Sequence, residues 1–174
     1  MRRLLAILAC AVPTVSACHK NKPPVVIPAA APAPTPAPPP PAEHLIGIDQ
    51  DARLYYDDVP SFPDSIRQVI RDAESLSSVW AQATKGQASA PPLPYVDFSR
   101  SIVLLVGAGK LRSGDQIHVD SVGTRDGRLV AVVRTTVDCH SIPTAAYPFE
   151  IVRVKRSDRA VSFVERRSKA PDCE

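Results

Sequence analysis

The sequence predicts an α+β fold: a mainly antiparallel β meander packed on one helix, after a signal peptide and a disordered Pro-rich linker. Three observations predict it. Residues 101–165 contain short runs of β-branched residues separated by Gly and Asp turns, which is typical of consecutive antiparallel strands. Residues 66–84 have an apolar pattern that suits a helix able to cover one face of the sheet. Residues 20–42 contain prolines too dense for helix or sheet.

The N-terminal residues are typical of an exported lipoprotein. Two arginines precede an apolar run at residues 4–12, which is too short to span a bilayer as a mature helix. Val15-Ser16-Ala17-Cys18 resembles the lipobox of bacterial lipoproteins, in which a peptidase cuts before a cysteine that has received a diacylglyceryl group. This resemblance implies that residues 1–17 are removed and that Cys18 becomes a triacylated N-terminus. An ordinary secretory signal with an incidental cysteine is the alternative.

Acylation would hold the protein on a membrane without a transmembrane helix, because two or more acyl chains anchor stably. Position 19 is His, whereas Asp there is the usual signal for retention in the inner membrane; the resemblance therefore favours the outer membrane, facing the periplasm. Residues 18–42 then comprise the acylated cysteine and a Pro/Ala-rich linker. A polyproline II tract rises about 3.1 Å per residue, so about 20 residues reach about 60 Å from the lipid surface.

Residues 43–174 predict one globular domain, since about 130 residues are enough for a hydrophobic core. The whole chain has 21 Lys+Arg against 18 Asp+Glu, and loss of Arg2 and Arg3 with the leader lowers the net charge from +3 to +1. Nucleic acid or an anionic lipid surface would need a clustered basic face, and only residues 166–169 resemble one. That run suits a solvated tail, so we expect no nucleic-acid partner.

Two cysteines remain in the domain once Cys10 has left with the leader and Cys18 has been acylated. In an oxidising compartment, Cys139 and Cys173 most simply form a disulfide. Closing a loop of about 35 residues would stabilise the fold by roughly 4 kcal/mol through lost loop entropy. The bond would also fix the C-terminal tail to the domain.

The elements of the domain follow in chain order. A short strand is predicted at residues 53–57. Residues 66–84 fit either one amphipathic helix or a strand at 66–71 followed by a helix at 73–84 capped by Asp72, and we predict the second arrangement. Further strands are predicted at residues 101–107, 116–122, 129–137, 149–155 and 160–165. The dipeptide Asp126-Gly127 and the sequence RSDRA at residues 156–160 predict tight reversals between strands.

The sequence predicts no cofactor and no metal. The GAGK sequence at residues 107–110 lacks the first glycine and the Ser or Thr of a phosphate loop, so we expect a strand end that enters a turn. His118 with Asp120, two apart on one strand face, and Asp138-Cys139-His140 in a loop have metal-ligating side chains. No three ligands have zinc-like spacing, and a disulfide-bonded Cys139 is not a thiolate ligand, so no metal site is predicted.

No catalytic machinery is predicted either. Cys139 and His140 are adjacent, but neighbours on an extended chain point apart, so we do not expect them to form a nucleophile and base pair. No nucleophile elbow or paired-carboxylate motif is present. The sequence therefore predicts a protein that is not an enzyme.

The β-rich half of the domain contains a set of residues found in a known family. Val96-Asp97-Phe98-Ser99 leads into a strand, Gly109 and Gly114 lie in the following turn, and Pro148-Phe149 opens a late strand. With the preceding Trp80 segment, residues 66–156 resemble the PrcB C-terminal domain family, named after a lipoprotein that associates with a subtilisin-like protease complex. The family turn usually has a Thr-Gly-Gly-Tyr run, where this chain has Arg112, Ser113, Gly114 and Asp115.

The resemblance implies a non-catalytic domain that binds another exported protein. Its sharpest version is a protease-complex subunit that stabilises or presents an exported protease near the membrane. We expect the contact at an exposed strand edge, by β-augmentation, or at the turn formed by Arg112, Ser113, Gly114 and Asp115. The alternative is a cell-envelope scaffold or stress lipoprotein that binds cell wall or a small ligand.

Overall fold

The computed structural model describes residues 44–173, so the predicted signal peptide, Cys18 and the linker lie outside the described residues. Helix α1 spans Ala73–Ala83, and two short 3-10 turns are η1 (Gln50–Ala52) and η2 (Pro171–Cys173). The strands are β1 (His44–Gly47), β2 (Arg53–Asp57), β3 (Ser65–Ile70), β4 (Ser101–Ala108), β5 (Leu111–Ser113), β6 (Gln116–Arg125), β7 (Arg128–Val137), β8 (Ile142–Ala146), β9 (Phe149–Lys155) and β10 (Val161–Lys169). No helix among these residues is long and apolar enough to cross a membrane.

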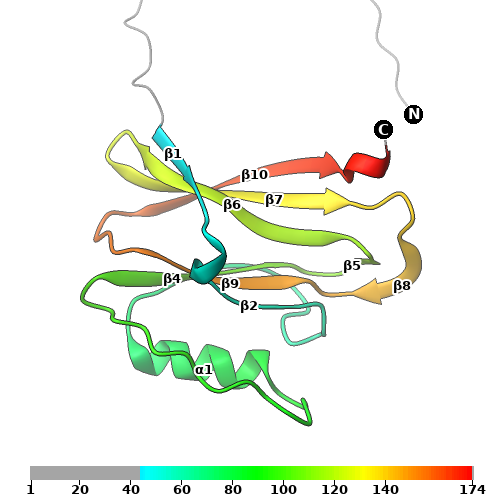
Figure 1. Ribbon diagram of the computed structural model, residues 1–174, viewed down its shortest axis with the longest axis horizontal. Coiled ribbons are helices and arrows are strands. Elements are labelled where there is room, and N and C mark those ends of the chain that lie inside the picture. Colours follow the sequence, from blue (N-terminus) through cyan, green and yellow to red (C-terminus); the bar gives the residue numbers. More distant parts are fainter. Residues whose placement is uncertain (1–43, 174) are drawn as a thin grey trace, which may run out of the picture. The chain divides into compact units, whose positions relative to one another are not determined.

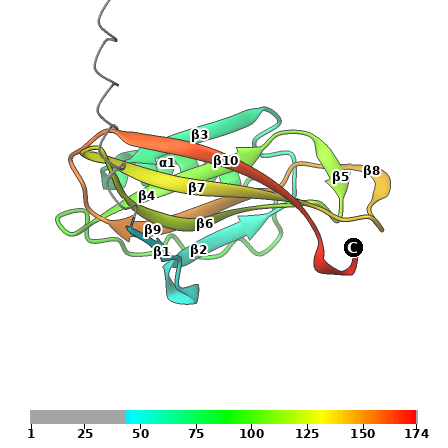
Figure 2. The same ribbon diagram turned by 90° about the horizontal axis from the view of Figure 1, so that it is seen from above.

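These elements form three layers (Figure 1). The outer sheet has the strand order β1-β6-β7-β10, and the middle sheet has the order β2-β9-β4-β3. Helix α1 covers the face of the middle sheet that points away from the outer sheet. Strands β5 and β8 form a separate pair at one end of the sheets (Figure 2). The predicted mainly antiparallel β structure with one helix is confirmed.

Strand β4 shows why the domain has two hydrophobic cores. Its residues 102–106 are fully buried, and their side chains alternate between the two faces of the middle sheet. Val103 and Leu105 pack with the helix, whereas Ile102, Leu104 and Val106 pack against the outer sheet. A strand buried on both faces is a continuous apolar run rather than an alternating one, as the sequence SIVLLVGA shows.

Helix α1 begins where the sequence predicts. Asp72 accepts a hydrogen bond from the backbone N–H of Ser75 at 2.7 Å, so its side chain caps the first turn. The buried face of the helix comprises Leu76, Val79, Trp80 and Ala83. Residues 65–70 pair with β4 as an antiparallel strand, which confirms strand plus helix and excludes the single helix.

The predicted meander is wrong, because the strands are not ordered as they occur in the chain. Strand β9 lies between β2 and β4, so both of its edges are occupied and neither is left for a hairpin partner. Residues 156–160 do reverse the chain, as predicted, but they do not form a hairpin: the segment crosses to the outer sheet, where β10 pairs in parallel with β7 (Figure 1). There Val161 and Phe163 pack against the core between the two sheets.

Two predicted turns are confirmed by backbone geometry. Asp126 and Gly127 have φ values of 48° and 73° between β6 and β7, as a two-residue type I′ hairpin requires. The GAGK sequence lies where β4 ends and the chain turns, and Gly109 there has a φ of 73°. The short strands β1, β5 and β8 were not predicted; they have three to five residues and no clear alternation.

Candidate functional site

A pocket of about 600 Å³ opens at one edge of the two packed sheets, between β2 and β9 on one side and β6 and β7 on the other. Strand β1 pairs with β6 only over residues 121–124, and the backbone N–H of Ile48 donates to Asp120 O at 3.4 Å, so residues 116–119 have no strand beside them on that edge within the described chain. We call it the Glu150 pocket, and its lining residues are Gln50, Arg53, Tyr55, Tyr56, Gln116, His118, Asp120, Arg134 and Glu150.

The carboxylate of Glu150 is buried, with only 1% of the side chain exposed. On β9, Phe149 and Ile151 face the helix, so Glu150 shares the opposite face with Val152 and Val154, which pack between the sheets. A charged side chain therefore occupies a core position at the point where the inter-sheet core meets the pocket. A buried charge is costly unless hydrogen bonds and an opposite charge compensate for lost hydration.

Three groups compensate the Glu150 carboxylate. Arg53 Nη1 donates a hydrogen bond to Oε1, and the backbone N–H of Val119 donates to Oε2 at 2.6 Å. His118 Nδ1 lies 3.1 Å from Oε1, which fixes the orientation of the imidazole. These groups come from β2 and β6, so the carboxylate of β9 links the two sheets at the pocket.

Tyr56 forms the aromatic wall of the pocket. Its ring stacks on His118, with 5.0 Å between ring centroids and 29° between planes, and 38% of the residue is exposed. Partial burial, with the nearby charges of Asp58, Glu150 and Asp57, raises the pKa of the phenol to about 12. The hydroxyl therefore remains protonated at physiological pH and is available as a hydrogen-bond donor.

An ion pair completes the pocket. Arg134 Nη2 lies 2.5 Å from Asp120 Oδ2, and Arg134 Nε donates to Oδ1 at 3.2 Å. These hydrogen bonds lower the pKa of Asp120 below its usual value. The two guanidinium groups of the pocket are thus each paired with one of its two carboxylates, and the ionic charge balances within the pocket. Such a lining favours a neutral or zwitterionic polar ligand group over a strongly charged one.

The sequence singled out His118 and Asp120 as side chains on one strand face. Both line the pocket, but a β-bulge between Val119 and Ser121 interrupts the alternation, and each side chain has a different partner: Glu150 for His118 and Arg134 for Asp120. Sequence reasoning missed the other members of the pocket. One signal was present in the predicted strand at residues 149–155: Glu150 alternates with Val152 and Val154, so all three side chains are expected on the same face of the strand.

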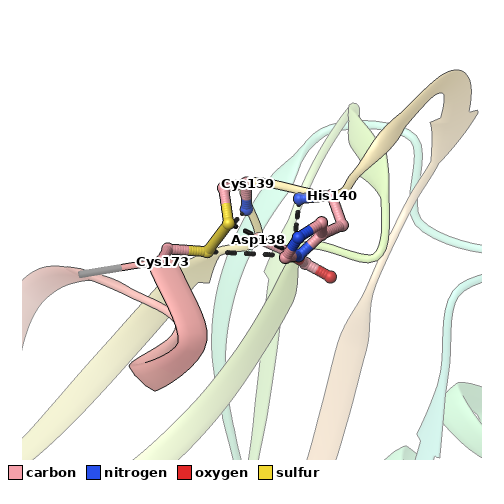
Figure 3. Close-up of side chains that lie close together, drawn as sticks. All are labelled: Asp138, Cys139, His140 and Cys173. Atoms are coloured by element: carbon pink, nitrogen blue, oxygen red, sulfur yellow. Dashed lines mark hydrogen bonds and ion pairs between the residues drawn. A yellow bond between two sulfur atoms is a disulfide. The ribbon is translucent and has the colours of Figure 1, made fainter.

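The predicted disulfide between Cys139 and Cys173 is present, with 5.6 Å between the Cα atoms (Figure 3). It joins the loop after β7 to η2 near the end of the chain. The expectation that Cys139 and His140 point apart is wrong, because residues 138–141 form a turn closed by Ser141 N–H donating to Asp138 O at 3.2 Å. His140 Nδ1 lies 3.4 Å from Cys139 Sγ as a result.

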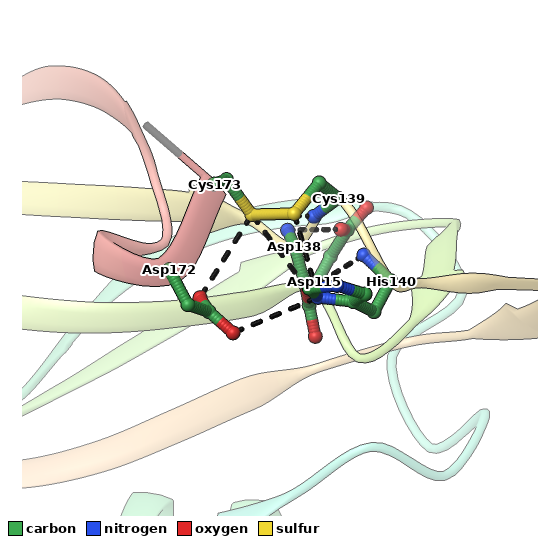
Figure 4. Close-up of polar contacts among 6 residues, drawn as sticks. All are labelled: Asp115, Asp138, Cys139, His140, Asp172 and Cys173. Atoms are coloured by element: carbon green, nitrogen blue, oxygen red, sulfur yellow. Dashed lines mark hydrogen bonds and ion pairs between the residues drawn. A yellow bond between two sulfur atoms is a disulfide. The ribbon is translucent and has the colours of Figure 1, made fainter.

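The turn predicted to bind a partner lies against the same loop (Figure 4). Asp115 is 6% exposed; it accepts hydrogen bonds from the backbone N–H groups of Arg112 at 3.3 Å and Asp138 at 3.0 Å. Asp115 therefore has a structural role, and Ser113 is half-buried, whereas Arg112 and Gly114 are exposed. The binding role of the turn remains a prediction. We call residues 112–115, 138–140, 172 and 173 together the disulfide corner.

A second hollow, of about 850 Å³, lies on the surface near the start of β4 and the end of β9. Its cations are Arg100, Arg153, Lys155 and Arg156, and its acids are Asp97 and Asp158. Every polar side chain that lines it is exposed or half-buried. It therefore lacks the fixed, desolvated groups that distinguish the Glu150 pocket.

Comparison with protein-family models, with curated proteins and with solved structures found no match to this chain. The resemblance to the PrcB C-terminal domain family thus rests on the residues quoted for it. In the structure, Asp97 accepts hydrogen bonds from Ser99 N–H at 2.9 Å and from its hydroxyl at 2.6 Å, and Phe98 packs against the helix-side core. The contacts of Asp97 and Phe98 within the domain therefore explain the presence of both residues without a partner.

Proposed function

We propose that the protein is an exported lipoprotein, anchored through acylated Cys18, whose β-rich domain is a non-catalytic binding module that uses the Glu150 pocket. The observation that supports this most is the buried carboxylate at an open pocket. Replacing a buried ion pair with apolar residues is often neutral or stabilising, so stability alone is a weak reason to keep one. A concave site with a few fixed polar groups is the usual form of a binding site.

The composition of the pocket favours binding over catalysis. Its lining residues include no serine, threonine or cysteine that would serve as a nucleophile. Each of its carboxylates accepts a hydrogen bond from an arginine, so both carboxylates are already engaged within the pocket. What the pocket offers is a set of oriented donors and acceptors beside an aromatic ring.

The partner we favour is another exported protein. Residues 116–118 of β6 border the pocket and have no strand beside them in the described chain, whereas the backbone of Val119 is already bonded to Glu150 and Arg53. An extended peptide would therefore pair with a short stretch of this edge. A partner segment that adds to this edge would gain backbone hydrogen bonds and place a polar side chain in the pocket. A protease-complex subunit that stabilises or presents an exported protease is the version that the family resemblance supports.

A second candidate is an envelope scaffold that binds cell wall or a small ligand. The stack of Tyr56 on His118 supports it, because a half-exposed aromatic face bordered by hydrogen-bonding groups suits the apolar face of a sugar ring. Peptide and glycan would occupy the same pocket, so capture from native membranes distinguishes them.

The test is cross-linking and affinity capture of the full-length acylated protein from its own membranes. The wild type is compared with Tyr56→Ala and with Tyr95→Ala, a matched change at a tyrosine that is 87% exposed in the second hollow. We expect an exported protein in stoichiometric amount from the wild type and Tyr95→Ala, and its loss from Tyr56→Ala. A protease assay on the eluate tests whether the captured partner is a protease.

Two outcomes would count against this proposal. Peptidoglycan fragments in place of a protein would favour the second candidate. Equal recovery from all three proteins would contradict a role for the Glu150 pocket. An Arg112→Ala variant run in parallel tests the predicted turn, since Arg112 is its exposed side chain.

A further inference from the structure

Four metal-ligating side chains meet in the disulfide corner: Asp138, Cys139, His140 and Cys173 (Figure 3). Their ligand atoms all lie within 4.8 Å of one another. While the two sulfurs are bonded to each other, neither is a thiolate ligand. We propose that reduction of this disulfide converts the corner into a tetrahedral zinc site with these four ligands. The inference does not depend on the proposed binding function.

The distances between ligand atoms already approach those of a zinc site. With Zn–S of about 2.3 Å and Zn–N or Zn–O of about 2.0–2.1 Å, tetrahedral geometry places ligand atoms about 3.3–3.8 Å apart. His140 Nδ1 lies 3.4 Å from Cys139 Sγ and 3.4 Å from Asp138 Oδ1. Asp138 Oδ1 lies 3.9 Å from Cys173 Sγ. The main change required is separation of the sulfurs to about 3.8 Å when their bond breaks.

Surrounding hydrogen bonds fit a metal site as well. The backbone N–H of Cys139 lies 2.8 Å from Cys173 Sγ, where it would stabilise a thiolate. Asp138 is held in place because its N–H donates to the buried Asp115 at 3.0 Å and its Oδ1 accepts from His140 N–H at 2.8 Å (Figure 4). Such outer contacts orient metal ligands and raise affinity.

The corner is also accessible and able to adjust. Cys139 and His140 are exposed, and η2 is a three-residue turn whose other members, Pro171 and Asp172, are exposed. None of the four ligands belongs to either hydrophobic core. The sulfurs can therefore separate without any change in the packing of the two sheets.

A dithiol would serve as the reductant of the Cys139–Cys173 disulfide. The two thiols of the reductant are oxidised to a disulfide, and the Cys139–Cys173 bond is reduced to two thiols. Zinc binding then displaces the two thiol protons, which are released to solvent. Two thiolates and an imidazole favour zinc over magnesium or calcium. Zinc would replace the disulfide as the link between the C-terminus and the loop after β7.

The test uses the full-length chain with Cys10→Ser and Cys18→Ser, so that Cys139 and Cys173 are its only cysteines. The reduced, metal-free chain is titrated with Zn²⁺, and with Co²⁺ as a spectroscopic probe. We expect one Zn²⁺ per chain with a Kd below about 0.1 μM, and a thiolate-to-cobalt charge-transfer band. We expect neither from the oxidised chain.

Variants make the result specific. His140→Ala should weaken Zn²⁺ binding by at least about tenfold, whereas His44→Ala, at an exposed histidine of β1, should leave it unchanged. Circular dichroism of the reduced chain shows whether it stays folded; if it unfolds, one equivalent of Zn²⁺ must restore the fold. Failure to restore it, equal binding by the oxidised chain, or an unaffected His140→Ala variant would overturn the proposal.

Discussion

Replacing Glu150 with glutamine tests whether the buried carboxylate organises the pocket. Glutamine keeps the shape of the side chain, but its NH₂ group would face one of the two donors now bound, Arg53 Nη1 or the N–H of Val119. Leaving a buried donor without an acceptor costs about 1–3 kcal/mol, and the charge-assisted hydrogen bond from the arginine is weakened as well. We therefore expect Glu150→Gln to lower the free energy of unfolding by about 2–4 kcal/mol.

Glu165→Gln is the matched control. Glu165 also pairs with an arginine through two oxygens, at 2.8 and 2.9 Å from Arg67, but 54% of its side chain is exposed. Water replaces the lost contacts there, so this change should cost less than about 1 kcal/mol. The free energy of unfolding of both variants is measured by urea denaturation, with the fluorescence of Trp80, the only tryptophan, as the signal. Equal costs for the two variants would refute the argument that burial gives Glu150 its role.

Four further substitutions test the fold and the pocket. Leu104→Ala and Leu105→Ala should each lower the free energy of unfolding by about 2–5 kcal/mol, because the two side chains are buried in different cores. Gly123→Ala should release β1 and speed its backbone hydrogen exchange, since a Cβ there would lie 2.2 Å from a backbone oxygen of β1. The lowered pKa of Asp120 adds stability above about pH 4 that is lost as pH falls through the folded pKa, so Arg134→Gln should lower the urea midpoint more at pH 7 than at pH 3.

Each of these changes has a control or a contrary outcome. Ile46→Ala, at a site 62% exposed, should change the free energy of unfolding by less than about 0.5 kcal/mol. A similarly small effect for either leucine would contradict a middle sheet covered on both faces. Gly47→Ala should leave exchange of β1 unchanged, because a Cβ at this position would have no atom within 4 Å outside the neighbouring residues. For Arg134→Gln, an effect of the same size at both pH values would exclude the Asp120 pair as its cause.

Local patterns in the sequence predict much of the fold. The β-branched and aliphatic run at 102–106 marks β4, Asp72 marks the start of the helix, and Asp126-Gly127 marks a hairpin. The sheet to which each strand belongs is not predictable in this way. Val161 and Phe163 give β10 an apolar face that would pack on either sheet. Strand β9 has no free edge for β10, but β2 and β3 are edge strands of the middle sheet, so nothing in the sequence directs β10 to β7.

The candidate site was less visible in the sequence than the fold. The partners of Glu150 are His118, 32 residues away, and Arg53, 97 residues away, so no local spacing connects them. The disulfide was predictable because it follows from the count of cysteines in an exported domain. The contact between Cys139 and His140 was missed, because an extended backbone was assumed for these residues, whereas Asp138 starts a turn by accepting hydrogen bonds from His140 N–H and Ser141 N–H.

A photoreactive amino acid at position 116 tests the central claim most directly. Gln116 is an exposed residue that lines the Glu150 pocket, so a probe there in the full-length protein in intact cells leaves Tyr56, His118 and Glu150 unchanged; the same probe at position 95 lies in the second hollow. The account predicts one dominant exported partner cross-linked from position 116 and none from position 95. Cross-linking from position 95 alone, or from neither position, would contradict the account.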